Sequence, residues 1–86
     1  MPVVSSGVTV GTSITEVSGP YISSKIVYLQ SGTEGAATYV GGADVSAANG
    51  ILLSETNNAV FQTNADDSLY CISDTAGAVV KVVEVK

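Results

Sequence analysis

Residues 25–30 read Lys25-Ile26-Val27-Tyr28-Leu29-Gln30, and this stretch decides the fold class. β-branched and aromatic side chains favour strands. Successive side chains of a strand point to opposite faces, so Val27 and Leu29 share one face while Ile26 and Tyr28 share the other. Both faces are apolar, which predicts a strand that is covered on both sides. The second cover is either a loop of the same chain or a neighbouring subunit.

The rest of the chain repeats this pattern in short segments. Fourteen valines are separated by nine glycines, and no window shows apolar residues at helical spacing. Turn residues recur every 8–12 residues or so, which is typical of a sandwich or barrel. We therefore predict an all-β fold, a single compact antiparallel β-sandwich or jelly-roll-like barrel of about seven or eight short strands. The expected strands cover residues 8–10, 12–17, 21 or 25 to 30, 36–40, 51–54, 60–63, 68–73 and 79–85.

Residues 44–50 are the one candidate for a helical turn. Asp44 opens the segment and Asn49-Gly50 closes it. These residue types cap the two ends of helices. We expect at most one turn here.

The last expected strand, residues 79–85, breaks the period of two between Val82 and Val83. A β-bulge would bring both pairs of valines to the core face. The alternative is a strand that is apolar on both faces near its end.

The chain length of 86 residues fits one domain. We predict a flexible N-terminal arm over residues 1–7 and a single β domain over residues 8–86. The first residues lack a basic start and an apolar run, so no signal peptide is expected, and no apolar stretch is long enough to span a membrane.

Composition excludes several function classes. Eight acids and three lysines give a net charge of −5, and histidine and arginine are absent. Binding to nucleic acid or to an anionic membrane is not expected, because three lysine side chains can neutralise only a few phosphate groups. Without histidine there is no imidazole for acid–base catalysis or for zinc. We expect no enzymatic activity, no catalytic residue, no cofactor and no metal.

The remaining polar groups have structural explanations. The acids stand mostly in turns, where they cap the backbone, and Lys25 and Lys81 are expected to face solvent. Residues 64–68 offer several oxygen atoms and leave a calcium site as an alternative to a hairpin turn. Cys71 lies between Tyr70 and Ile72, so we expect a buried, unreactive thiol. A lone cysteine in so small a chain indicates a reducing compartment.

The surface is expected to pack against other proteins. Charged residues make up 13% of the chain, about half the usual quarter. Tyrosine is enriched at interfaces, and three lysines protect few strand edges, which predicts self-association. The candidate interface residues are Pro2, Val3, Val4, Tyr21, Ile26, Tyr28 and Tyr39.

An ordered set of short motifs over about residues 8–86 resembles small structural proteins of tailed-phage virions. The motifs are Gly7-Val8-Thr9-Val10-Gly11-Thr12, Tyr28-Leu29-Gln30-Ser31-Gly32, Thr38-Tyr39-Val40-Gly41-Gly42, Val45-Ser46-Ala47-Ala48-Asn49-Gly50-Ile51-Leu52-Leu53, Leu69-Tyr70-Cys71-Ile72-Ser73-Asp74 and Val82-Val83-Glu84-Val85. The chain departs from that pattern at Val40, where leucine is common, and at Cys71, where alanine is common. Residues 23–25 replace basic residues that are often found there, so no electrostatic contact is carried over.

The resemblance implies a capsid decoration, or cement, protein. Such a protein binds the major capsid protein on the outer surface of the virion head and stabilises the junctions between capsid subunits after assembly in the host cytoplasm. Decoration proteins of this size often form trimers, so a homo-oligomer is expected, with a trimer favoured. The alternatives are a tail, baseplate or fibre-base subunit and a carbohydrate-binding module.

Overall fold

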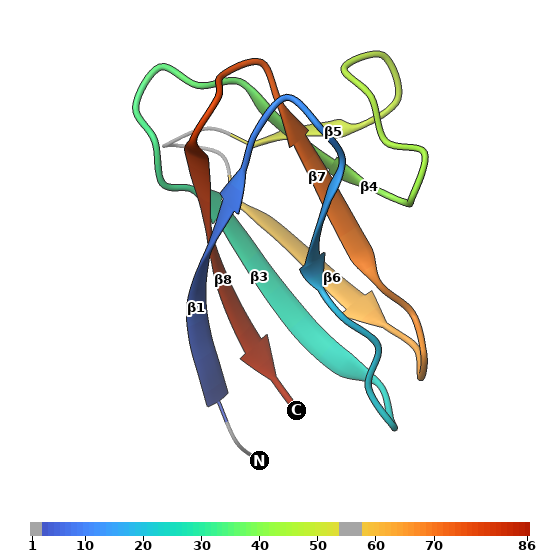
Figure 1. Cartoon of the computed structure of the whole chain (residues 1–86). Helices are drawn as coiled ribbons and strands as arrows, with labels where there is room; N and C mark the ends of the chain where they lie inside the picture. Colours follow the sequence, from blue (N-terminus) through green and yellow to red (C-terminus); the bar gives the residue numbers. More distant parts are fainter. Residues whose placement is uncertain (1–2, 54–57) are drawn as a thin grey trace.

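The structure, a computed structural model, describes residues 3–53 and 58–86. Figure 1 shows two sheets packed face to face, and no helix occurs among the described residues. Consequently no helix in this part of the chain is long enough to cross a membrane. The eight strands are β1 (Val3–Val10), β2 (Thr15–Ser18), β3 (Lys25–Ser31), β4 (Thr38–Gly41), β5 (Ile51–Leu53), β6 (Ala59–Thr63), β7 (Leu69–Ser73) and β8 (Ala78–Val85).

The strand order is that of a jelly roll. One four-stranded sheet has the order β1-β8-β3-β6 and the other has the order β2-β7-β4-β5. All the pairs are antiparallel, and β4 with β5 is the one pair of described strands that is also consecutive in sequence. Every other connection crosses between the sheets, as two interlocked Greek keys require. The all-β prediction, with its sandwich or jelly roll, is confirmed.

The core lies between the two sheets. Alternate residues of each strand point inward, and those of β3 and β8 form its centre: Val27, Leu29, Val80 and Val82 are at most 1% exposed. The opposite sheet contributes Val40 and Leu53. The whole cluster comprises Val10, Val17, Val27, Leu29, Val40, Leu53, Ala59, Leu69, Cys71, Val80 and Val82.

Residues 3–7 belong to a strand, where the sequence predicted an arm. They form the first part of β1 and pair in register with β8, from Val3 opposite Val85 to Gly7 opposite Lys81. The long valine-rich strand β8 gives the backbone of β1 a hydrogen-bonding partner along its whole length. Both described ends of the chain therefore lie at the same end of the molecule (Figure 1). Residues 1–2 of the predicted arm lie outside the described residues.

The predicted bulge in the last strand is wrong. The pairing of β8 with β1 and with β3 is continuous, so the strand is apolar on both faces near its end, the alternative that the sequence left open. Val83 and Val85 point outward, and Glu84 takes the inward phase of Val82. The register shift occurs instead in β2, between Glu16 and Ser18.

Residues 46–50 form a single turn within the expected segment, and Ser46 caps it in place of Asp44, because Ala48 N donates to Ser46 Oγ at 3.3 Å. Gly50 N donates to Ser46 O at 2.8 Å, and Ser46 N donates to Asn49 Oδ1 at 2.7 Å. The turn folds back on β4, because a Cβ on Gly50 would lie 2.7 Å from Tyr39 Cβ and 2.8 Å from Val45 Cγ2. Only glycine permits this approach.

Candidate functional site

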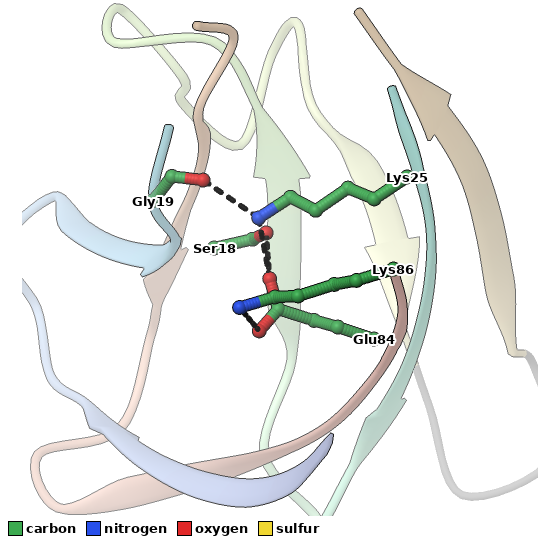
Figure 2. Close-up of polar contacts among 5 residues, drawn as sticks. All are labelled: Ser18, Gly19, Lys25, Glu84 and Lys86. Carbon is green, nitrogen blue, oxygen red and sulfur yellow. Dashed lines mark hydrogen bonds and ion pairs between the residues drawn. The ribbon is translucent and has the colours of Figure 1, made fainter. Parts of the chain in front are cut away.

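A buried charge cluster lies at the end of the sandwich where β3 begins and β8 ends (Figure 2). Lys25 of β3 places Nζ 2.5 Å from Glu84 Oε2 and donates to Gly19 O at 2.6 Å. Ser18 Oγ donates to the same carboxylate oxygen at 2.8 Å. Lys25 is 4% exposed, so the prediction that it faces solvent is wrong. Lys25, Val27 and Leu29 are alternate residues of β3, so their side chains point to the same side of the sheet, which is the core side.

The cluster holds Glu84 in its ionised form. Burial raises the pKa of the Glu84 carboxyl, but hydrogen bonds from Lys25 and Ser18 and the charges of Lys25 and Lys86 outweigh it and lower the pKa. Lys86 Nζ lies 3.9 Å from Glu84 Oε1 and 4.8 Å from the centre of the Tyr21 ring. A carboxylate stabilised in this way is a poor proton acceptor. The cluster joins β3, β8 and the end of β2.

The thiol of Cys71 is shut inside the core. The side chain is 0% exposed, and desolvation by burial raises its pKa to about 12. The thiolate is the nucleophile of cysteine chemistry, so Cys71 is inert in the folded protein. The prediction of a small buried hydrophobe is confirmed.

The loop at residues 64–68 joins the two sheets. It connects β6 to β7, which belong to different sheets, so it is not the hairpin turn that the sequence predicted. Asp67 N donates to Asn64 O, and Asn64 N donates to Asp67 Oδ2, both at 3.2 Å. Asp66 adopts a left-handed φ of 68°. Among the described residues, no three acidic or cysteine side chains gather as metal ligands.

Two depressions lie on the outer surfaces. The larger has a volume of about 220 Å³ and is lined by Tyr28, Leu29, Gln30, Asn58, Lys81 and Val83. The smaller has a volume of about 90 Å³ and is lined by Tyr39, Ala47, Ile72, Ser73 and Asp74. Pockets for small molecules usually enclose about 300–1,000 Å³. Both depressions are therefore better suited to single side chains of a protein partner.

The outer surface of sheet β1-β8-β3-β6 has an apolar centre. The register places Val83, Tyr28 and Val60 in one row and Val85 beside Ile26 in the next. Val60 is 57% exposed and Tyr28 45% exposed. We call this surface the lysine face, because Lys81 is its one charged side chain within residues 3–53 and 58–86. Its centre comprises Val3, Ile26, Tyr28, Val60, Lys81, Val83 and Val85, and the same register places the uncharged polar residues Ser5, Thr9, Gln30 and Gln62 around them.

The outer surface of sheet β2-β7-β4-β5 is apolar and acidic. Glu16 lies opposite Tyr70, and Tyr39 lies between Ile72 and Leu52. Asp74 follows the end of β7 at the rim of the smaller depression. We call this surface the acidic face, since its charged side chains in the described part are carboxylates. It comprises Glu16, Tyr39, Leu52, Tyr70, Ile72 and Asp74.

The predicted interface residues are divided between these surfaces. Val3, Ile26 and Tyr28 lie together on the lysine face, whereas Tyr39 lies on the acidic face. Tyr21 stands apart beside the charge cluster. The remaining two are Val4, which takes the inward phase of β1 and is 40% exposed, and Pro2, which lies outside the described residues.

Sequence reasoning missed Val60, Val83 and Val85 as members of the lysine face. The signal was present in the last strand, where the valines change phase between Val82 and Val83. The bulge interpretation assigned all of them to the core. For Val60 no comparable signal exists, because its face depends on the pairing with β3.

The edge strand β1 is long and uncharged. Residues 3–10 read Val-Val-Ser-Ser-Gly-Val-Thr-Val, and β1 pairs only with β8 within its sheet. Unpaired N–H and C=O groups along an edge strand readily pair with another chain. Charged residues, which normally protect such an edge, are absent from this strand.

No protein-family model matches the chain, and no curated protein matches it. The fold is similar to that of a solved structure described as Bacillus endospore appendages, which form a novel family of disulfide-linked pili. The similarity has a TM-score of 0.56 at 20% sequence identity and covers 99% of this chain and 85% of that chain. At this identity the likeness establishes the fold alone.

This comparison overturns the assignment to phage virions. The solved structure belongs to a bacterial pilus and not to a phage particle, so the expected cement function and virion location are wrong. The motifs behind that assignment are strand ends and turns, such as Tyr28–Gly32 at the end of β3 and Thr38–Gly42 in and after β4. The chain thus shares its fold with a subunit of an endospore appendage.

Proposed function

We propose that this protein is a structural subunit that self-associates into a surface appendage and acts without catalysis. Its fold is similar to that of a pilus protein. Its described surface offers two apolar outer faces and an uncharged edge strand. These features favour an assembly of many copies over a soluble monomer.

The observation that carries the proposal is the edge of β1. This eight-residue strand has no charged side chain and a partner on one side only. An exposed, uncharged edge of this length is a site of strand addition. Repetition of weak contacts along a polymer gives a stable assembly, because each added contact is effectively intramolecular.

The contacts between copies of these 86 residues would be non-covalent. The Bacillus appendages are described as disulfide-linked. Here the single cysteine, Cys71, is fully buried with a raised pKa. A disulfide between folded copies through this residue would require the core to open.

The test is self-association of the purified chain. Mass by light scattering over a hundredfold concentration range, with electron microscopy of the concentrated sample, should show concentration-dependent assembly into filaments. Ser6→Lys adds a charge at an exposed position of β1 and should suppress assembly; because Ser6 has the inward phase and lies opposite Val82, circular dichroism and urea unfolding must show that the variant is folded. Ser23→Lys makes the same change in an exposed turn and should leave assembly unchanged. A wild-type protein that stays monomeric throughout would refute the proposal.

A further inference from the structure

We infer that the lysine face of one copy docks on the acidic face of the next copy. The inference rests on the proposed function and names the partner of both outer faces as a second copy of this chain. It concerns the flat surfaces of the two sheets and not the edge of β1.

Among the residues that the structure describes, only one of the three lysines is free to contact another molecule through its charge. Of the three lysines, Lys25 is buried against Glu84, and Lys86 lies near the same carboxylate. Lys81 is exposed and forms no ion pair with any described residue. It stands on an apolar face whose described residues include no acid.

The other outer face has the opposite charge. Glu16 is exposed and pairs with no lysine in the described part of the chain, and Asp74 is exposed at the rim of the smaller depression. That depression is lined by Tyr39 and Ile72, and such surfaces accommodate the methylene stem of a lysine. Stacking two lysine faces would oppose like charges, as would stacking two acidic faces. Docking unlike faces brings opposite charges together.

The dimensions of the two faces set the size of their contact. Four strands about 4.8 Å apart make a face about 20 Å wide, and the short strands of the acidic face extend about 10–17 Å. Each contact therefore buries on the order of 300 Å² per partner, or about 600 Å² in total. This is below the roughly 1,200 Å² at which stable specific interfaces begin, so a single contact is weak and the stack holds through repetition. Because the two faces differ, their contact is heterologous. A pair of docked copies still has one free lysine face and one free acidic face, so further copies can add at both ends and form an open stack. With sheets about 10 Å apart, copies repeat about every 20 Å along it.

Charge reversal and mixing test the inference. Lys81→Glu makes both faces acidic, and Glu16→Lys adds a positive charge to the acidic face. Each variant alone should need a protein concentration about tenfold higher than wild type to assemble, since like charges then meet across the contact. An equimolar mixture should assemble again, because each variant supplies the charge that the other has lost. Folding of each variant is checked by circular dichroism.

Charge-matched controls separate this effect from net charge. Glu34→Lys reverses an exposed turn acid, and the double variant Ser23→Glu/Ser24→Glu adds two negative charges in another exposed turn. Both should assemble like wild type. If wild type assembles and Lys81→Glu assembles equally well, the inference is wrong while the proposed function stands. If the mixture is not rescued, the pairing of these two faces is refuted. A monomeric wild type refutes the proposed function and this inference together.

Discussion

Replacing Glu84 with glutamine removes the charge of the buried carboxylate and preserves the shape of the side chain. Lys25 would then keep Gly19 O as its strong acceptor while its ammonium group stays buried, with a side chain 2% exposed. Breaking a buried ion pair by removing one partner costs about 3–5 kcal/mol. Glu84 is 13% exposed, which places the expected loss near the lower bound, at about 3 kcal/mol.

A loss of this size is large for this protein. Domains have free energies of unfolding of about 0.05–0.15 kcal/mol per residue, or about 4–13 kcal/mol for a chain of this length. A loss of about 3 kcal/mol corresponds to a fall in Tm of about 12–24 °C. Urea unfolding followed by far-ultraviolet circular dichroism measures the change, because the chain has no tryptophan. Glu34→Gln makes the same chemical change at an exposed turn and should stay within about 0.5 kcal/mol of wild type.

A double-mutant cycle identifies the cause. Lys25→Met combined with Glu84→Gln removes the unpaired charge, so the double variant should be more stable than Glu84→Gln alone. Additive losses, or a Glu84→Gln variant within about 0.5 kcal/mol of wild type, would refute the view that the ion pair is buried and coupled.

The remaining predictions concern pH, the thiol and two packed sites. Since the folded pKa of Glu84 lies below 4.5, its contribution is complete above that pH and is lost as the pH falls through the folded value; acid unfolding of Glu84→Gln should show a correspondingly weaker pH dependence. Cys71 should resist alkylation at pH 8 in the folded protein and react only on unfolding, which mass spectrometry detects; rapid labelling would contradict its burial. Gly50→Ala should destabilise by about 2 kcal/mol through overpacking, whereas Gly11→Ala, with no atom within 4 Å of the new Cβ, should have little effect in the same urea assay. Thr63→Val should stabilise by about 1 kcal/mol, because the buried Thr63 hydroxyl has no hydrogen-bond partner in the described residues; a loss of stability would show that the hydroxyl is satisfied.

The lesson about function is that short motifs of strand ends and turns identify a fold better than a biological setting. The phage resemblance rested on segments such as Leu69–Asp74, whose inward residues fill the core and whose outward residues alternate with them. Any jelly roll with short strands places similar constraints on such segments. The lysine face and the acidic face, in contrast, consist of outward-pointing residues, which packing of the core does not constrain.

Local sequence determined the all-β class, the number of strands and the burial of Cys71. These follow from alternation and turn residues, which act over a few neighbouring positions. The single turn at residues 46–50 is of the same kind, because its caps lie within it.

Only the tertiary structure decided which face of each strand is buried and which is exposed. Lys25 looked solvent-facing in isolation, but its phase in β3 and the inward Glu84 of β8 bring the two charges together across 59 positions of sequence. The strand order set β1 at an edge and gathered Val60, Tyr28 and Val83 into one outer row. Alternation fixes which residues share a face of one strand, whereas pairing between distant strands decides what that face meets.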